Sequence, residues 1–280
     1  MLIMNRKWHY ILVCLISIVT ISFSCTNDDN EIVDFPKENE PSSLFNERLF
    51  ICHRGLDGYP ENTLVAIEAA INAGYKAIEC DIEITKDGIP VLSHDKTIDR
   101  CSNGRGRISD MTYLDLLQYD FGSWKDSRFT GEKIPTLDEV LKQCKKYNVI
   151  LELDLAGKIP GERIDTIYNV VANNDMLDLT LFTARDNQLK VFLSQKKDVC
   201  ISISGVYNLD IAMSSLYLRD YSMYSNFSLP ADSVKKEIVE YAHTNGVKVK
   251  TWPVDEASKA KMLFNMGVDY IQTNVLGPEL

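Results

Sequence analysis

Two pairs of carboxylates lie inside apolar runs of this sequence. Glu79 and Asp81 stand in the run 77–81, and Glu152 and Asp154 stand in the run 149–154. A charge within an apolar strand is costly unless it is paired or bound to a metal. Residues two apart in a strand point to the same side. Each pair could belong to a salt-bridge network, but converging carboxylates also favour a site for Ca²⁺ or Mg²⁺ rather than zinc.

Two histidines end strand-like runs near these carboxylates. His53 closes the run 49–53 and His94 closes a second apolar stretch. A lone histidine at a strand end is often structural, but two beside a divalent ion suit general acid–base cleavage of a phosphodiester. The guanidinium of Arg54 is a suitable fork for a phosphate oxygen. The third histidine outside the N-terminal segment, His243, is expected at the surface of a helix.

The elements that must position these residues alternate along the chain. Short apolar runs and longer helical patterns follow one another, as in a parallel sheet built from βαβ units. The expected strands are 49–53, 77–81, 149–154, 179–183, 200–204, 222–227, 247–252 and 270–273. The expected helices are 63–73, 137–147, 161–174, 186–195, 208–218, 231–244 and 256–266. Eight such units favour an α/β fold of the TIM type, a (β/α)8 barrel, over a doubly wound sheet, because no Gly-rich phosphate loop follows the first strand.

One connection is longer than the others. After the second strand, Asp87-Gly88 lies between two alternating segments, which is a strong hairpin signal. The polar, Gly-rich stretch that follows reaches Pro135. We expect 82–135 to be an insertion on the second βα loop, at the end of the barrel where active sites lie.

The N-terminus has the features of an exported protein. Arg6 and Lys7 precede an apolar stretch too short to span a bilayer comfortably, which is typical of a signal peptide. Small residues before Cys25 resemble a bacterial lipoprotein signal, so 1–24 is expected to be removed and Cys25 to be lipidated. An ordinary cleaved signal with Cys25 incidental is the alternative. Residues 25–44 are polar and acidic with two prolines, as expected of a tether that precedes the domain 45–280. This anchor would place the protein on the cell envelope, facing the periplasm or the cell surface.

The composition of the chain limits the kinds of partner and of covalent or metal cross-link that are expected. The net charge of −10 argues against a nucleic-acid partner, because phosphate backbones require a basic surface. Five cysteines remain beyond Cys25, an odd number without tight spacing, so neither a disulfide framework nor a zinc site is expected. Cys52 and Cys80 fall inside apolar runs and are expected to be buried.

Together the motifs resemble the glycerophosphodiester phosphodiesterase family. The resemblance covers about 47–275 and is most specific in the N-terminal half. It rests on His53-Arg54-Gly55, Pro60-Glu61-Asn62-Thr63, Glu79-x-Asp81, Val91-x-x-His94-Asp95, Asp99-Arg100, Asn103-Gly104-x-Gly106, Gly122-Ser123-Trp124, Ile134-Pro135-Thr136-Leu137, Trp252 and Gly267-Val268-Asp269-Tyr270-Ile271-x-Thr273.

The resemblance implies roles for these positions. His53 and His94 would be the acid–base pair, and Glu79, Asp81 and Glu152 would bind one divalent cation, Ca²⁺ or Mg²⁺. Glu61 and Asn62 would support the metal and the catalytic groups, although the stretch around them is also a helix start. The substrate would be a glycerophosphodiester, cleaved to glycerol 3-phosphate and an alcohol.

The chain departs from the family pattern in the third strand. Asp154 stands where a lysine that reaches the phosphate is usual. Asp154 could become an extra ligand of the cation or reshape the substrate pocket. Lys250 shares its side of the seventh strand with Trp252, and we expect Lys250 to restore the missing positive charge from across the barrel. Trp252 would pack on the glycerol or the head group, or be a core aromatic. Asn274 also replaces a common aspartate at the end of the eighth strand.

Three other functions compete with this prediction. A related barrel phosphodiesterase could act on phospholipid or inositol head groups. A non-catalytic lipoprotein could bind phosphodiesters, but it would be expected to lack one of the histidines or carboxylates. A glycosidase barrel also uses paired carboxylates, but it would not need both histidines.

Overall fold

The computed structural model describes residues 41–155, 161–184, 190, 193, 195–196, 198–222 and 224–280. The predicted signal peptide and Cys25 lie outside these residues, as do most of the predicted tether and of the helix 186–195. Among the described helices, none combines the length and the apolar character needed to cross a membrane.

Eight parallel strands form a closed barrel, which confirms the predicted (β/α)8 fold. Each strand pairs with the next, and β1 pairs with both β2 and β9, so the sheet has no open edge. The strands are β1 (Leu49–His53), β2 (Ala77–Ile84), β4 (Ile150–Asp154), β5 (Thr180–Ala184), β6 (Cys200–Ser204), β7 (Tyr224–Pro230), β8 (Lys248–Trp252) and β9 (Tyr270–Thr273). Three of these match the predicted ranges residue for residue, and the others differ by a few residues at their ends.

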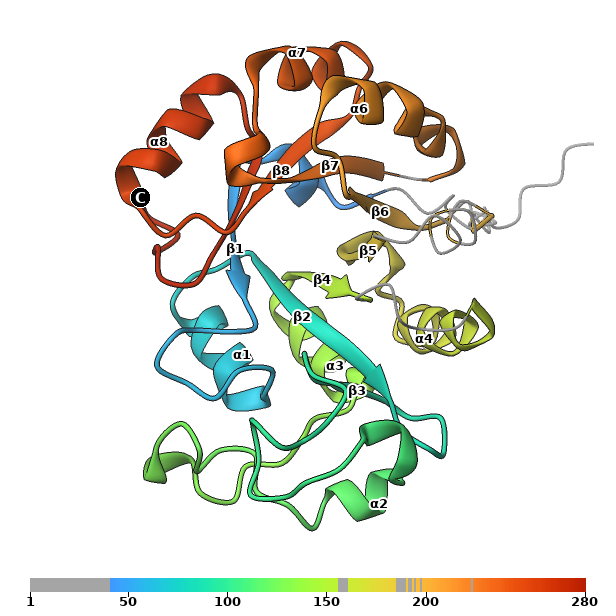
Figure 1. Ribbon diagram of the computed structural model, residues 1–280, viewed down its shortest axis with the longest axis vertical. Helices are drawn as coiled ribbons and strands as arrows, with labels where there is room; N and C mark the ends of the chain where they lie inside the picture. Colours follow the sequence, from blue (N-terminus) through green and yellow to red (C-terminus); the bar gives the residue numbers. More distant parts are fainter. Residues whose placement is uncertain are drawn as a thin grey trace, which may run out of the picture. The chain divides into compact units, whose positions relative to one another are not determined.

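Helices follow the strands and lie around the outside of the barrel (Figure 1). They are α1 (Leu64–Asn72), α3 (Leu137–Tyr147), α4 (Gly161–Asn173), α6 (Leu209–Ser215), α7 (Lys236–Thr244) and α8 (Ala257–Met266). Two starts show why the boundaries fall where they do. The Thr63 side chain accepts from the backbone N–H of Ala66 to cap α1, and Thr136 forms a reciprocal capping box with Glu139 at α3.

The helix predicted from residue 231 begins later than expected. Ala231–Ser233 form a 3₁₀ turn, η6, and α7 starts at Lys236. The backbone of Val234 is extended, with φ −69° and ψ 121°, so the turn cannot continue into the helix. The helix predicted over 208–218 also differs from the observed one, because α6 ends at Ser215 and the chain continues as a 3₁₀ segment, η5 (Leu216–Tyr221).

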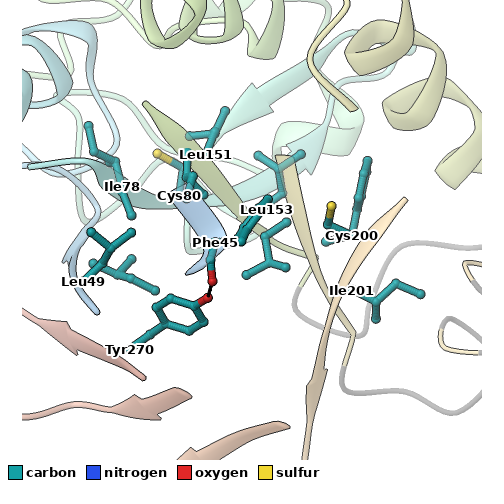
Figure 2. Close-up of a cluster of buried hydrophobic side chains, with 14 of the residues drawn as sticks. Phe45, Leu49, Ile78, Cys80, Leu151, Leu153, Cys200, Ile201 and Tyr270 are labelled. Carbon is teal, nitrogen blue, oxygen red and sulfur yellow. Dashed lines mark hydrogen bonds between the residues drawn. The ribbon is translucent and has the colours of Figure 1, made fainter. Parts of the chain in front are cut away.

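The main core fills the space between strands and helices. Figure 2 shows Cys80, Leu151 and Leu153 packed together in this core, and Cys52 is fully buried as well. At the N-terminal ends of the strands, Phe45 of η1 (Ser43–Asn46) stacks on Tyr224, with ring centroids 4.5 Å apart. The Tyr270 hydroxyl donates to the Phe45 carbonyl, the contact dashed in Figure 2. The core therefore includes the segment just before β1.

The insertion after β2 has a small core of its own. β2 continues past the barrel and pairs antiparallel with β3 (Pro90–Leu92), as the Asp87-Gly88 turn predicted. Beyond β3 lie η2 (Ile108–Asp110), α2 (Tyr113–Leu116) and η3 (Ser127–Phe129). Buried side chains from the whole insertion form a second cluster: Val91, Ile98, Ile108, Leu116, Phe121 and Ile134. This cluster holds the loop that carries His94.

Candidate active site

A cavity of about 230 Å³ lies at the C-terminal ends of the barrel strands. Side chains from all eight barrel strands, and His94 from the insertion, line it. The residues are His53, Arg54, Glu79, Asp81, His94, Glu152, Asp154, Thr183, Ser204, Ser228, Lys250, Trp252, Pro253 and Gln272. Every polar residue predicted from a strand end is therefore brought together in one place. Of the predicted supporting residues, Glu61 and Asn62 contact this set from the loop after β1.

Four carboxylates enter the cavity from two adjacent strands in register. Glu79 pairs with Glu152 and Asp81 with Asp154 in the parallel ladder between β2 and β4. All four side chains are buried, with at most 7% of any residue exposed. Burial first, and then repulsion from the neighbouring carboxylates, raise the pKa of Glu79 well above its ordinary value. Such crowding is unfavourable without a cation nearby.

Three of the four carboxylates converge. Ligand atoms of Glu79, Asp81 and Asp154 all lie within 4.8 Å of one another. Glu79 Oε2 is buried and has no hydrogen-bond partner among the described residues. The site therefore offers oxygen ligands and an orphaned acceptor, which fit a hard divalent cation.

The fourth carboxylate is engaged elsewhere. Glu152 Oε1 forms an ion pair with the Lys250 ammonium and accepts a hydrogen bond from the Thr183 hydroxyl. Lys250, predicted to bring positive charge from across the barrel, does lie in the cavity, with 2% of the residue exposed. Its charge is directed to Glu152. Asp154, which was expected to be a possible extra ligand, thus lies among the converging carboxylates, and the role that the family resemblance implied for Glu152 as a ligand stays a prediction.

The turn after β1 is held by unusual backbone geometry. Arg54 and Asn62 have left-handed φ angles of 60° and 56°, and Gly55 has φ 87°. The Arg54 N–H donates to the Glu79 carbonyl, and the Asn62 N–H donates to the Arg54 carbonyl. Such conformations cost free energy and persist where surrounding contacts fix them. Here they direct Arg54 Nε to 2.9 Å from Asp81 Oδ2, and Asn62 Nδ2 donates to the same oxygen over 2.9 Å.

A substitution at Gly55 would test whether close packing fixes this turn. A Cβ at this position would lie 2.6 Å from the Ala66 Cβ and 2.8 Å from its carbonyl carbon. Gly58 has a similar φ of 86° but nothing within 4 Å of its added Cβ. We expect Gly58→Ala to lower the free energy of unfolding by about 1–2 kcal/mol, from backbone strain alone. We expect Gly55→Ala to lower it by more, and to lower activity as well, because α1 must also move. Thermal unfolding of the two variants compares the costs, and equal shifts would contradict the packing argument.

The two histidines have different surroundings. His53 Nδ1 lies 2.7 Å from Asn274 Oδ1, and the Asn274 amide nitrogen donates to Asp255 over 2.7 Å. Because Asp255 fixes the amide, its oxygen faces His53 and Nδ1 must carry the proton, which leaves Nε2 as the basic atom. Nε2 lies 3.7 Å from Glu79 Oε2. Burial is the main cause that lowers the pKa of His53, and the charge of Arg54 lowers it further, although the hydrogen bond that His53 Nδ1 donates to the Asn274 oxygen raises it.

His94 is half-exposed and bonded to a carboxylate. Its Nδ1 lies 2.7 Å from Asp95 Oδ1, and Arg100 Nε donates to the other Asp95 oxygen over 2.7 Å. A hydrogen bond from Arg100 holds the pKa of Asp95 below its ordinary value. Arg100 also donates to both oxygens of Glu61, which accepts from Arg54 as well. One guanidinium thus connects the insertion to the turn after β1.

Sequence reasoning missed several of these residues. It named Asp95 and Arg100 within motifs and noted Asn274 as a departure from the family pattern, but it gave none of them a role. It did not single out Asp255 or Thr183. Asn274 and Asp255 follow strand ends, which is the signal that could have found them. Nothing in the spacing of Arg100 indicated its partners. His243 is partly exposed at the end of α7 and pairs with Asp269 over 2.8 Å, outside the cavity, as expected of a surface residue.

Comparison with known proteins agrees with this geometry. The model of the glycerophosphoryl diester phosphodiesterase family matches residues 53–277. The chain belongs to this family. The recognition made from the motifs is thereby confirmed.

Relatives match over most of the chain. A glycerophosphodiester phosphodiesterase of Caldanaerobacter subterraneus is 29% identical over 233 residues, covering 81% of this chain and 93% of the relative. Mouse glycerophosphodiester phosphodiesterase 1 is also 29% identical, covering 81% of this chain and 78% of the relative. Among solved structures, a phosphodiesterase from Oleispira antarctica, in complex with the product sn-glycerol-3-phosphate, has a TM-score of 0.74 and 27% identity. That match covers 82% of this chain and 94% of the other.

Proposed function

We propose that this protein hydrolyses glycerophosphodiesters to glycerol 3-phosphate and an alcohol, by two-histidine acid–base catalysis that depends on a divalent cation. The main support for this proposal is that both histidines, Arg54 and the converging carboxylates line the same cavity. Membership of the family supports the reaction. The solved relative that holds sn-glycerol-3-phosphate supports the product.

The charge balance of the cavity supports one divalent cation. Four carboxylates line it, against two basic side chains, Arg54 and Lys250. With all four carboxylates ionised, two negative charges are left, which one Ca²⁺ or Mg²⁺ would neutralise. Glu79, Asp81 and Asp154 would hold the ion, with Glu152 close by through its unpartnered Oε2. When bound, such an ion would polarise the phosphoryl oxygens of the substrate.

The surroundings of the histidines support a different role for each. His53 has a free Nε2 and a lowered pKa, so it is suited to take the proton from the attacking hydroxyl. That hydroxyl belongs either to water or to the neighbouring carbon of the glycerol, in which case a cyclic phosphate forms first and water then opens it. His94, bonded to the Asp95 carboxylate, is suited to give a proton to the leaving alcohol. Arg54 faces the cavity and would bind a phosphoryl oxygen.

The proposed base predicts a pH dependence. A base must be unprotonated, and burial lowers the pKa of His53 below its ordinary value of 6.5. We expect kcat/KM to fall on the acid side only below pH 6.5, because His53 stays neutral down to its own lowered pKa. A nearby bound cation would lower that pKa further. A pH profile of kcat/KM measures this, and an acid limb above 6.5 would contradict the assignment.

The decisive assay is release of glycerol 3-phosphate. Purified protein is incubated with several glycerophosphodiesters in Ca²⁺, in Mg²⁺ or with a chelator. We expect release with at least one cation and none after chelation. No release under any condition, from protein whose folding has been verified by circular dichroism, would overturn the proposed function.

We also propose that Cys25 is lipidated and anchors the protein to the cell envelope, in the periplasm or at the cell surface. The support is the sequence alone: a basic start, an apolar stretch and small residues before Cys25, followed by an acidic tether. We expect wild-type protein in the membrane fraction and Cys25→Ser in the soluble fraction of expressing cells. Equal distribution of the two would overturn the anchor.

A further inference from the structure

His94 is the one proposed catalytic group that comes from the insertion rather than from the barrel. It follows the end of β3 at Leu92, in a stretch that belongs to no helix or strand. Its side chain is 45% exposed. An exposed side chain on such a loop can adopt several rotamers, whereas a general acid must keep its proton near the leaving oxygen. Contacts outside the ring must therefore fix its direction.

Asp95 provides the first of these contacts. Its Oδ1 lies 2.7 Å from His94 Nδ1, which leaves Nε2 as the nitrogen that can give a proton in the cavity. The Asp95 side chain is itself 33% exposed and adjacent in sequence, so the two residues could move together. An exposed ion pair of this kind contributes little on its own. A further contact is needed to hold the pair in place.

Arg100 connects this pair to the barrel. Its Nε donates to Asp95 Oδ2 over 2.7 Å. Its Nη1 and Nη2 donate to the two oxygens of Glu61 over 2.8 and 2.9 Å. Glu61 lies between β1 and α1, outside the insertion. Because the guanidinium is planar and all three of its nitrogens are engaged, it fixes the Asp95 carboxylate relative to the turn after β1.

Glu61 is in turn held by the residues of the catalytic cavity. Its Oε1 also accepts from Arg54 Nη1 over 3.1 Å, and Arg54 Nε lies 2.9 Å from Asp81 Oδ2 on β2. Although burial raises the pKa of Glu61, hydrogen bonds and charges of Arg100 and Arg54 bring it below its ordinary value. Glu61 is therefore ionised and accepts from both arginines. The contacts run without a break from His94 to a carboxylate of the cavity.

We propose that Arg100 is a positioning residue for the general acid: through Asp95 it directs His94 Nε2 toward the leaving oxygen, with Glu61 as its anchor. The inference rests on the proposed function and adds a residue from outside the cavity to the reaction. Arg54 keeps its contact with Asp81 when Arg100 is removed, so the effect on catalysis passes through His94. A lysine would supply the same charge, but as a single point it cannot serve both carboxylates in this geometry.

The first test is the kinetics of two Arg100 variants on a glycerophosphodiester with an alkyl leaving group. We expect Arg100→Met to lower kcat about 10²-fold and Arg100→Lys at least about tenfold, since a misplacement of about 1 Å can cost that much. KM should change little, because Arg54 and the carboxylates stay in place. Arg128→Met is the matched control. Arg128 lies in the same insertion and pairs with Asp126 over 3.3 Å, but it does not line the cavity. Its kinetics should equal those of the wild type.

Two further measurements separate positioning from a loosened insertion. A nitrophenyl diester, whose leaving group needs no proton, should recover most of the loss in Arg100→Met. In the double variant Arg100→Met/His94→Ala, kcat should equal that of His94→Ala alone, because no acid is left to position. A purely structural defect would slow both substrates and add to the loss in His94→Ala. Circular dichroism and thermal unfolding verify that each variant is folded at the assay temperature.

The outcomes separate this inference from the proposed function. With an active wild type, full activity in either Arg100 variant, equal losses on the two substrates, or additive losses in the double variant would each overturn the positioning role. A folded wild-type protein that cleaves neither substrate with Ca²⁺ or Mg²⁺ would overturn the phosphodiesterase function, and the role of Arg100 with it.

Discussion

Replacing His53 or His94 by alanine is expected to lower kcat for glycerophosphodiesters about 10²–10⁴-fold, the usual contribution of a positioned acid or base. The two losses should differ in their dependence on the leaving group. An alcohol needs a proton as it leaves, whereas a nitrophenolate does not. We therefore expect a nitrophenyl diester to recover much of the loss in His94→Ala and little of the loss in His53→Ala. Steady-state kinetics on both substrates, with saturating divalent cation, measure the difference.

His243→Ala is the control for these variants. It removes a histidine that is also paired with a carboxylate, Asp269, but lies outside the cavity. Its activity should stay close to that of the wild type, because His243 does not line the catalytic cavity. Equal recovery of both active-site variants on the nitrophenyl diester would show that the assigned roles are wrong.

Lys250→Met is expected to destabilise the metal-free protein by about 3–5 kcal/mol. Removing one partner of a buried ion pair leaves the other charge uncompensated. Here that charge is Glu152, which is fully buried and accepts in addition from Thr183. Lys250→Met/Glu152→Gln should recover most of the loss, since it removes the stranded charge. Denaturant unfolding in the presence of a chelator measures the free energies.

Two comparisons make this prediction specific. Lys248→Met alters the same strand, but the ion pair of Lys248 with Asp269 is partly exposed and should be worth at most about 1 kcal/mol. Adding Ca²⁺ should also reduce the cost of Lys250→Met, because a cation among the carboxylates offsets the charge of Glu152. A Lys250→Met protein as stable as the wild type without metal would show that the pair contributes nothing.

Local patterns in the sequence predicted most of the fold. The strands of a closed barrel are buried on both faces, so each appears as an apolar run, and the turn at Asp87-Gly88 marked the hairpin. The ends of helices and strands were predicted less accurately, because the pattern of side chains does not always determine where an element begins or ends. The extended backbone at Val234, for example, delays α7 although the residues before it resemble a helix start.

The site was predicted as a set of residues but not as a set of contacts. Side chains two residues apart in a strand point to the same side, and this spacing placed Glu79, Asp81, Glu152 and Asp154 on the cavity side. The spacing does not determine which carboxylate a lysine on the opposite side of the barrel will contact. Lys250 joins Glu152 rather than Asp154 because of the strand register across the barrel, which no short segment of sequence contains. The same holds for Arg100, whose partners come from two separate loops.

His94 depends on a structure apart from the barrel. It is carried by the insertion, whose six-residue core is a separate hydrophobic cluster, and Arg100 ties that insertion to the turn after β1. Small packed units open locally at a lower free energy than the core of a domain. Heating should therefore abolish activity before the barrel unfolds, so the working temperature range of the protein is set by the insertion rather than by its larger core.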